Sequence, residues 1–387
     1  MPQAGKKIFS ISLVTVLSIA AAIVGARAQS PAAPAQSSSP NSAPLAEQQY
    51  KNIKVLKGIP ADQVIPAMEF IAASLGVECE FCHVRKEHGL AFEKDEKKPK
   101  EIARKMIEMA NAINKNNFDG KREVTCYSCH RGAAHPVGIP LVAVEGEKPP
   151  MPEHENQPNT TWPSGDDLFA KYLTAAGGAD AINKITSRVE KGTISGFGDQ
   201  HFSIDIAAKA PDKRWSTMHT PGGESTTAYD GKVGWLSFPG RPVHMMNAAE
   251  SAGARIDADF HLPVDAKSLR DKWKPAPGEA IDGHATNLLV GQTEGEPPLR
   301  LYFDAQTGLL VRLIRYVETP VGRLPTQVDY ADYRDADGAK IPYQWSISRP
   351  GNRFTIQVEQ LQQNVPVDDS KFAPPPPPPA GQAPAQP

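Results

Sequence analysis

Two stretches in the first third of the chain have the spacing of apolar residues that is typical of helices. In residues 60–76, apolar side chains recur at steps of three and four, and Gly76 stands where a helix would end. In the second stretch, Pro99 stands where a helix could begin. The apolar faces consist of Val64, Ile65, Met68, Ile71, Ala72 and Leu75 in the first helix, and Ile102, Met106, Met109, Ala110 and Ile113 in the second.

From Arg188 onward the pattern changes to strands separated by tight turns, with two short helical segments before them at 166–175 and 179–185. We predict a strongly curved antiparallel sheet or half-barrel with a helix on one side. The predicted strands include 201–206, 299–303, 309–316, 343–348 and 353–361, and the predicted turns are Asp230-Gly231, Asp304 to Gly308 and Asp337-Gly338.

The N-terminus has the pattern of a secretory signal peptide. Lys6 and Lys7 precede the mostly apolar run Ile8 to Val24, and Ala26-Arg27-Ala28 is a small-residue cleavage site. We therefore expect residues 1–28 to be removed after Ala28 and the protein to lie in the periplasm. The alternative is an uncleaved anchor that keeps the chain at the membrane, although a 17-residue run with several hydroxyl residues spans a bilayer poorly.

The 37 prolines are placed unevenly and divide the chain. Residues 29–47 are predicted to be a disordered linker, 143–163 a Pro-rich linker, and 374–387 a disordered Pro-rich tail. Two folded units remain, at 48–142 and 164–373. The formal net charge of −2 gives no sign of nucleic-acid binding. The second unit shows no nucleophile–base pair, phosphate loop or metal-spaced cluster, so we do not expect an enzyme.

All four cysteines lie in two copies of the motif C-x-x-C-H, from Cys79 to His83 and from Cys126 to His130. Two thiols at this spacing can each add to one vinyl group of a porphyrin, and the histidine that follows can ligate the iron. Zinc held by four thiolates and a disulfide within each pair are the alternatives, but neither gives the histidines a role. The motifs predict two covalent c-type haems.

A methionine on the helix before each motif is a candidate sixth ligand of the iron. Met68 lies 11 positions before Cys79, while Met106 and Met109 lie 20 and 17 positions before Cys126. A thioether suits haem iron and raises its reduction potential, but methionine is also an ordinary core residue. Spacing alone does not choose between Met106 and Met109. His88 and His135, each five residues after a motif histidine, are the alternative distal ligands.

Residues 55–136 resemble the cytochrome c subunit of photosynthetic reaction centres. The resemblance is carried by the run Val124 to Gly132, by Ala103 to Met109, by Ala112-Ile113-Asn114 and by the approach from Met68 to Cys79. It implies that each haem is bound by a C-x-x-C-H motif and by a methionine from the helix upstream. The implied ligands are Met68 for the haem on Cys79, Cys82 and His83, and Met106 for the haem on Cys126, Cys129 and His130.

That family's usual subunit carries four haems, so this chain resembles a half-size version of it. The resemblance implies periplasmic electron transfer that re-reduces a photo-oxidised donor. The implied partner is a redox protein, either a membrane-bound reaction centre or, in a non-photosynthetic cell, a respiratory complex.

The C-terminal part resembles the lipoprotein-carrier fold of periplasmic sorting proteins, through residues 176–182, 228–231, 303–310 and 329–333. This resemblance implies an apolar ligand in the β domain. The alternative function is therefore an apolar-ligand or lipid-binding periplasmic protein with a redox-sensing haem module. In either case we expect an α+β multidomain protein: a small α-helical dihaem cytochrome c domain, followed by an antiparallel β half-barrel domain with a flanking helix.

Overall fold

The computed structural model describes residues 44–87, 89–136 and 162–375, and these residues belong to one compact unit. The predicted signal peptide, most of both predicted linkers and most of the predicted tail lie outside the described residues. Within the described ranges, no helix is long and apolar enough to cross a membrane.

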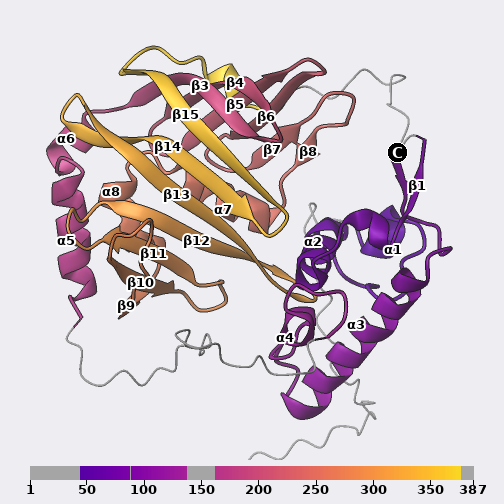
Figure 1. The fold of residues 1–387 in the computed structure, drawn as a ribbon. Coiled ribbons are helices and arrows are strands. Elements are labelled where there is room, and N and C mark those ends of the chain that lie inside the picture. The colour runs from indigo at the N-terminus through magenta and orange to yellow at the C-terminus, as the bar shows by residue number, and fades with distance from the viewer. Residues whose placement is uncertain (1–43, 88, 137–161, 376–387) are drawn as a thin grey trace, which may run out of the picture. The chain divides into compact units, whose positions relative to one another are not determined.

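Both helices expected in the first third of the chain are present (Figure 1). Gly76, at φ 63° and ψ 38°, ends the first in the left-handed conformation, and Pro99 lies in the first turn of the second. The elements of this part are α1 (Ala46–Gln49), a 3-10 turn (Ala61–Gln63), α2 (Val64–Leu75), a 3-10 turn (Cys79–Phe81), β1 (Val84–Lys86), β2 (Gly89–Ala91), α3 (Lys98–Asn117) and α4 (Cys126–His130).

Helix α1 begins inside the last residues of the stretch predicted as a linker. Ala46 is fully buried, and its N–H donates to the carbonyl of Ile59 at 2.8 Å. A tertiary contact therefore orders this end of the stretch, which a composition-based prediction does not detect.

The rest of the described chain forms one antiparallel sheet of 13 strands with helices around it (Figure 1). Strands that follow one another in sequence pair with each other, except that β8 and β9 lie at opposite edges of the sheet. In the middle of the sheet β3 pairs with β15, which places the ends of the domain side by side. The strands are β3 (Ser187–Phe197), β4 (Gln200–Lys209), β5 (Lys213–Thr220), β6 (Gly223–Tyr229), β7 (Gly234–Ser237), β8 (His244–Met245), β9 (Lys272–Pro277), β10 (Thr286–Gln292), β11 (Leu299–Asp304), β12 (Leu310–Thr319), β13 (Gly322–Ala336), β14 (Ala339–Arg349) and β15 (Asn352–Gln363).

The predicted turns follow from local chemistry. Asp337 and Gly338 both have positive φ, at 53° and 84°, as a two-residue turn between β13 and β14 requires. The Asp304 carboxylate accepts hydrogen bonds from the backbone N–H groups of Gln306 and Thr307 and so closes the turn between β11 and β12. The helices of this part are α5 (Gly165–Ala175), α6 (Ala179–Asn183), α7 (Ala248–Ala258) and α8 (Leu262–Asp265).

Helix α7 shows that the sheet is strongly curved. Asp257 binds Arg315 of β12 through two hydrogen bonds of 3.1 and 2.6 Å, and the hydroxyl of Ser251 accepts from the N–H of Gly234 in β7 at 3.3 Å. In the sheet order β7 and β12 are eight positions apart, which is ~38 Å in a flat sheet. Ser251 and Asp257 are only ~9 Å apart along a helix. The sheet therefore curls around α7, as expected of a half-barrel.

Helix α7 was not predicted from the sequence, although its start carries a recognisable signal. The side chain of Asn247 accepts from the N–H of Glu250 at 2.8 Å, and the Glu250 carboxylate accepts from the N–H of Asn247 at 2.9 Å. This reciprocal capping box is readable as Asn-x-x-Glu in the sequence.

The main core lies between helix α5 and strands β10 to β12. Leu289, Leu299 and Leu301 are fully buried there, and Phe303 is 1% exposed. Helix α5 adds Leu168, Phe169 and Tyr172 to the same cluster. The confirmed fold class is therefore α+β with a large antiparallel sheet.

Candidate haem site

The second C-x-x-C-H motif forms the short helix α4. Cys126 and Cys129 are three positions apart, which places both thiols on one face of the helix. The carbonyl of Ala133 lies 2.9 Å from Nδ1 of His130. Because a carbonyl oxygen only accepts, Nδ1 carries the proton and Nε2 keeps its lone pair for a metal.

The first motif forms a 3-10 turn, and the N–H of His83 donates to the carbonyl of Cys79 at 3.0 Å. The ring of Phe92 meets the His83 imidazole edge to face, with centroids 5.0 Å apart. Burial, and then the positive charge of Lys100, lower the pKa of His83, which favours the neutral imidazole that a metal requires. Its Nδ1 is buried and makes no hydrogen bond. The backbone of Phe92 acts in the opposite direction on the pKa of His83 and offsets part of the lowering.

Cations hold the loop that carries Phe92 against the first motif. Lys97 donates to the Glu80 carbonyl within the motif, and Lys100 donates to the Phe92 carbonyl at 2.7 Å. The carboxylate of Asp95 binds Lys100 at 3.0 Å, and it also binds Lys54 at 2.6 Å and Arg104 at 2.9 Å.

Replacing Asp95 by Asn is expected to destabilise the protein at neutral pH. Hydrogen bonds from Arg104 and then Lys54 hold the pKa of Asp95 well below its usual range. The carboxylate therefore stabilises the fold above about pH 4, and this contribution is lost as pH falls further. Thermal unfolding of the two proteins should differ at pH 7 and converge towards pH 3. A difference that grows on acidification would contradict this role.

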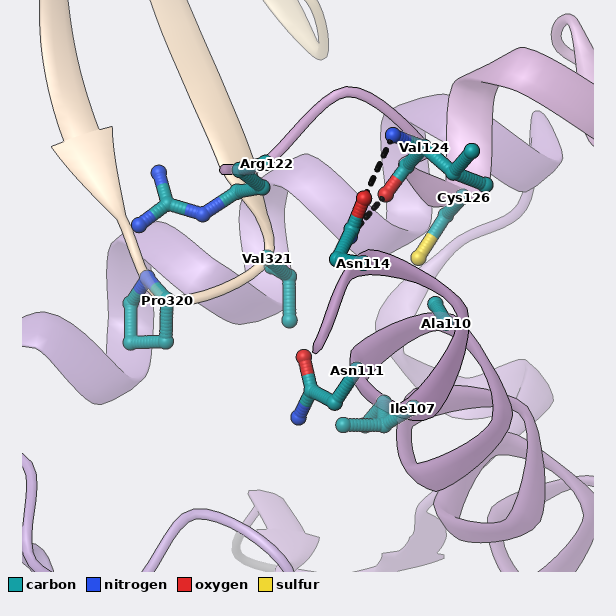
Figure 2. A pocket seen from close by; sticks show the side chains of 9 residues that line it. All are labelled: Ile107, Ala110, Asn111, Asn114, Arg122, Val124, Cys126, Pro320 and Val321. Atoms are coloured by element: carbon teal, nitrogen blue, oxygen red, sulfur yellow. Dashed lines mark hydrogen bonds between the residues drawn. The ribbon is translucent and has the colours of Figure 1, made fainter. Parts of the chain in front are cut away.

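Asn114 of α3 holds the chain that enters the second motif. Its amide donates to the carbonyl of Val124 at 2.7 Å, and its oxygen accepts from the N–H groups of Glu123 and Val124 at 3.1 and 2.9 Å. Figure 2 shows this clamp, with the sulfur of Cys126 directed toward Ala110 of α3. The sequence does not reveal that Asn114 binds this segment, because its partners lie nine and ten residues away on an irregular stretch.

Ala110, Asn114 and Cys126 line one side of a small pocket, and the turn between β12 and β13 lines the other side (Figure 2). Val321 is 6% exposed and packs in one apolar cluster with Phe70, Ile71 and Ile107, while Arg122 pairs with Glu318 at 2.8 Å. A hairpin of the large sheet therefore contributes to the surroundings of Cys126.

The candidate methionines lie on the helices as expected. Met68 is half-buried against the same apolar cluster, whereas Met106 and Met109 are 36% and 47% exposed. These exposures do not separate Met106 from Met109, so the choice of Met106 still follows from the resemblance alone. His135 is exposed, and His88 lies outside the described residues.

Residues 44–136 carry many large apolar side chains on their surface. Exposed apolar surface of this kind typically marks a binding site. On α3, Ile102, Met106 and Met109 form an exposed stripe at helical spacing. The other exposed large apolar residues here are Leu45, Ile65, Phe81, Phe92, Phe118 and Tyr127.

The donor set fits a c-type haem at each motif. All four cysteines are free thiols, and burial raises the pKa of Cys82 and Cys126, which keeps those two protonated at neutral pH. His130 offers Nε2, and the exposed apolar side chains offer contacts to a porphyrin. In the part of the chain that the structure describes, no group of three or more His, Cys, Asp or Glu side chains could hold a metal ion.

Comparisons with solved structures return distant matches. A DUF1329 family protein from Desulfovibrio piger is 13% identical with a TM-score of 0.38, covering 54% of this chain and 96% of its own. A LolA superfamily protein from Nitrosomonas europaea is 11% identical with a TM-score of 0.35, covering 54% of this chain and 97% of its own. These likenesses assign no ligand to this chain.

Comparisons by sequence return a family of cytochrome subunits. Residues 10–190 match the family model of the photosynthetic reaction centre cytochrome c subunit. Such subunits from Rubrivivax gelatinosus and Roseobacter denitrificans are 32% and 35% identical over 114 and 104 residues, which is 28% and 24% of this chain. The matches span 29% and 27% of those relatives, so this chain spans less than a third of their length. Over residues 10–190, the chain is therefore similar to the cytochrome c subunits of photosynthetic reaction centres.

Proposed function

We propose that this protein is a periplasmic electron carrier with two c-type haems. One haem is attached to Cys79 and Cys82 with His83 on its iron, and the other to Cys126 and Cys129 with His130. Met68 and Met106 are the proposed sixth ligands. The observation that carries the proposal is the pair of complete C-x-x-C-H motifs, which use every cysteine of the chain.

Three further observations support it. The family match covers both motifs. The protonated Nδ1 of His130 leaves Nε2 for iron, and the pKa of His83 is lowered towards the neutral form. The exposed stripe on α3 gives a porphyrin an apolar surface to cover.

When bound, each haem supplies an iron that takes up and gives back one electron. The residues of this chain then set how readily that happens. Methionine sulfur favours the reduced iron, and the ammonium groups of Lys97 and Lys100 beside the first motif act in the same direction. These ammonium groups should therefore raise the reduction potential of the first haem.

We further propose that residues 48–142 and 164–373 are two domains within the compact unit, and that the signal peptide is cleaved after Ala28. The partner is a redox protein of the membrane, either a reaction centre or a respiratory complex. Two haems fit such a carrier because one can face the electron donor and the other the acceptor.

Replacement of the proposed methionine ligands tests the ligation. Met68→Ala and Met106→Ala should each remove the methionine-to-iron charge-transfer band of one haem, which is about half of the total band, and lower that haem's potential. The measurements are the near-infrared-edge absorption of the oxidised protein and a redox titration. Met109→Ala is the matched control, since it lies on the same exposed stripe. If Met109→Ala removes the band and Met106→Ala does not, the assignment is wrong.

A further inference from the structure

The segments that carry the two motifs touch each other through their backbones. The N–H of Gly132 donates to the carbonyl of Ser74 at 2.9 Å. A Cβ atom at Gly76 would lie 2.1 Å from the carbonyl oxygen of Gly132, a separation that no side chain tolerates. We call this contact the Gly76–Gly132 junction. It forms only because position 76 has no side chain.

The junction is held firmly on the α2 side. Ser74 is 1% exposed, and its hydroxyl donates to the carbonyl of Phe70 at 2.7 Å. Gly76 adopts φ 63°, and its N–H bonds to the carbonyls of Ala72 and Ala73. A helix end that is bonded in this way has little freedom to shift.

The opposite side is a helix end as well. Arg131, at φ 50°, ends α4, and its N–H donates to the carbonyl of Tyr127 at 3.2 Å. Gly132 follows at φ 84°. The junction therefore joins the C-terminal end of α2, which precedes the first motif, to Gly132, which follows the second motif.

Both motifs start or end within a few residues of this contact. Cys79 is three residues after Gly76, and His130 is two residues before Gly132. An extended chain reaches at most ~3.6 Å per residue. The backbone of Cys79 therefore lies within about 11 Å of Gly76, and that of His130 within about 7 Å of Gly132.

We infer that the Gly76–Gly132 junction sets the separation and mutual orientation of the two haem groups, which makes Gly76 a positioning residue for electron passage between them. The inference rests on the proposed function, because it presupposes two covalent haems. A side chain at position 76 has to displace the carbonyl of Gly132, which follows α4, or to shift the turn that leads to Cys79.

The test compares Gly76→Ala with Gly132→Ala in the full-length holoprotein. Both glycines have positive φ, so both alanines strain the backbone in a similar way. Only the alanine at 76 meets another atom, because a Cβ at Gly132 has nothing within 4 Å. The pair therefore separates the contact at the junction from the strain of a left-handed alanine.

The readout is circular dichroism in the Soret band, where two haems held close together give a bisignate signal. Haem content is measured first, by a pyridine haemochrome assay. A haem count other than two in the unmodified chain would refute the proposed function, independently of the junction. With two haems, we expect a bisignate signal in the unmodified chain and in Gly132→Ala, and its loss or inversion in Gly76→Ala.

Three results would overturn the inference: an unchanged signal in Gly76→Ala, an equal change in both variants, or no bisignate signal in an unmodified chain with two haems. If Gly76→Ala does not fold, Gly76→Asn takes its place. Asparagine tolerates the left-handed conformation better than alanine, yet its Cβ makes the same clash. A mere loss of stability would lower the unfolding temperature and leave the signal of the folded protein as it was.

Discussion

Replacing both Cys126 and Cys129 by Ala is expected to reduce the covalently bound haem from two per chain to one. Each motif holds its own pair of thiols, and no thioether can form without them. Cys79 and Cys82 remain free to react, so the first haem should stay. The pyridine haemochrome assay and the mass of the denatured chain report the number directly.

Tyr127→Ala is the matched control for this experiment. Tyr127 stands between the two cysteines and is 56% exposed, but it offers no thiol, so its replacement should leave two haems in place. Two haems in the double cysteine variant, or none in the unmodified chain, would contradict the assignment. The reciprocal variant, with Cys79 and Cys82 replaced, should keep only the second haem.

The variant that lacks the second haem should also be less stable than the unmodified chain. A porphyrin there would cover apolar side chains that the polypeptide leaves exposed, such as Met106 and Met109. Burial of apolar surface is worth roughly 25 cal/mol per Å², so uncovering part of that surface lowers the free energy of unfolding. Thermal unfolding followed by far-ultraviolet circular dichroism measures this loss.

Replacing Phe303 by Ala is expected to lower the free energy of unfolding by about 3–5 kcal/mol. Phe303 is 1% exposed on β11, and its ring packs against Tyr172 and Phe169 of α5, with centroids 5.3 and 6.1 Å apart. Alanine leaves a cavity at the contact between the helix and the sheet, because the surrounding strands cannot collapse into it.

Denaturant unfolding of the full-length holoprotein, followed by tryptophan fluorescence, measures this effect. Phe238→Ala is the control, because Phe238 is 43% exposed and its loss should change stability by less than about 0.5 kcal/mol. Similar losses in the two variants would show that Phe303 is not part of the cooperative core.

Much of the fold could be predicted wherever a signal is local. The spacing of Val64, Met68 and Ile71 predicts a helix because neighbours on a helix surface are three and four residues apart. The pair Asp337-Gly338 predicts a two-residue turn because both positions need positive φ. The C-x-x-C-H motif is equally local, since its thiols and imidazole are fixed relative to one another within five residues.

Other features depend on residues that are distant in the sequence, and no local pattern announces them. The pairing of β3 with β15 is of this kind, as is the position of α7 within the curved sheet. Asp95 draws Lys54 and Arg104 together from separate elements, and the turn at Val321 reaches the surroundings of Cys126.

The order of residues along the chain specifies which chemical groups this protein presents: two pairs of thiols, each with a histidine, and helices that bear methionines. How the two sets lie relative to each other depends on the folded backbone. The contact between Gly76 and Gly132 joins residues 56 positions apart, and nothing in the sequence relates these two glycines to each other. The physical reason is that covalent spacing acts along the chain, whereas exclusion of a side chain by a distant carbonyl arises only once the backbone is folded.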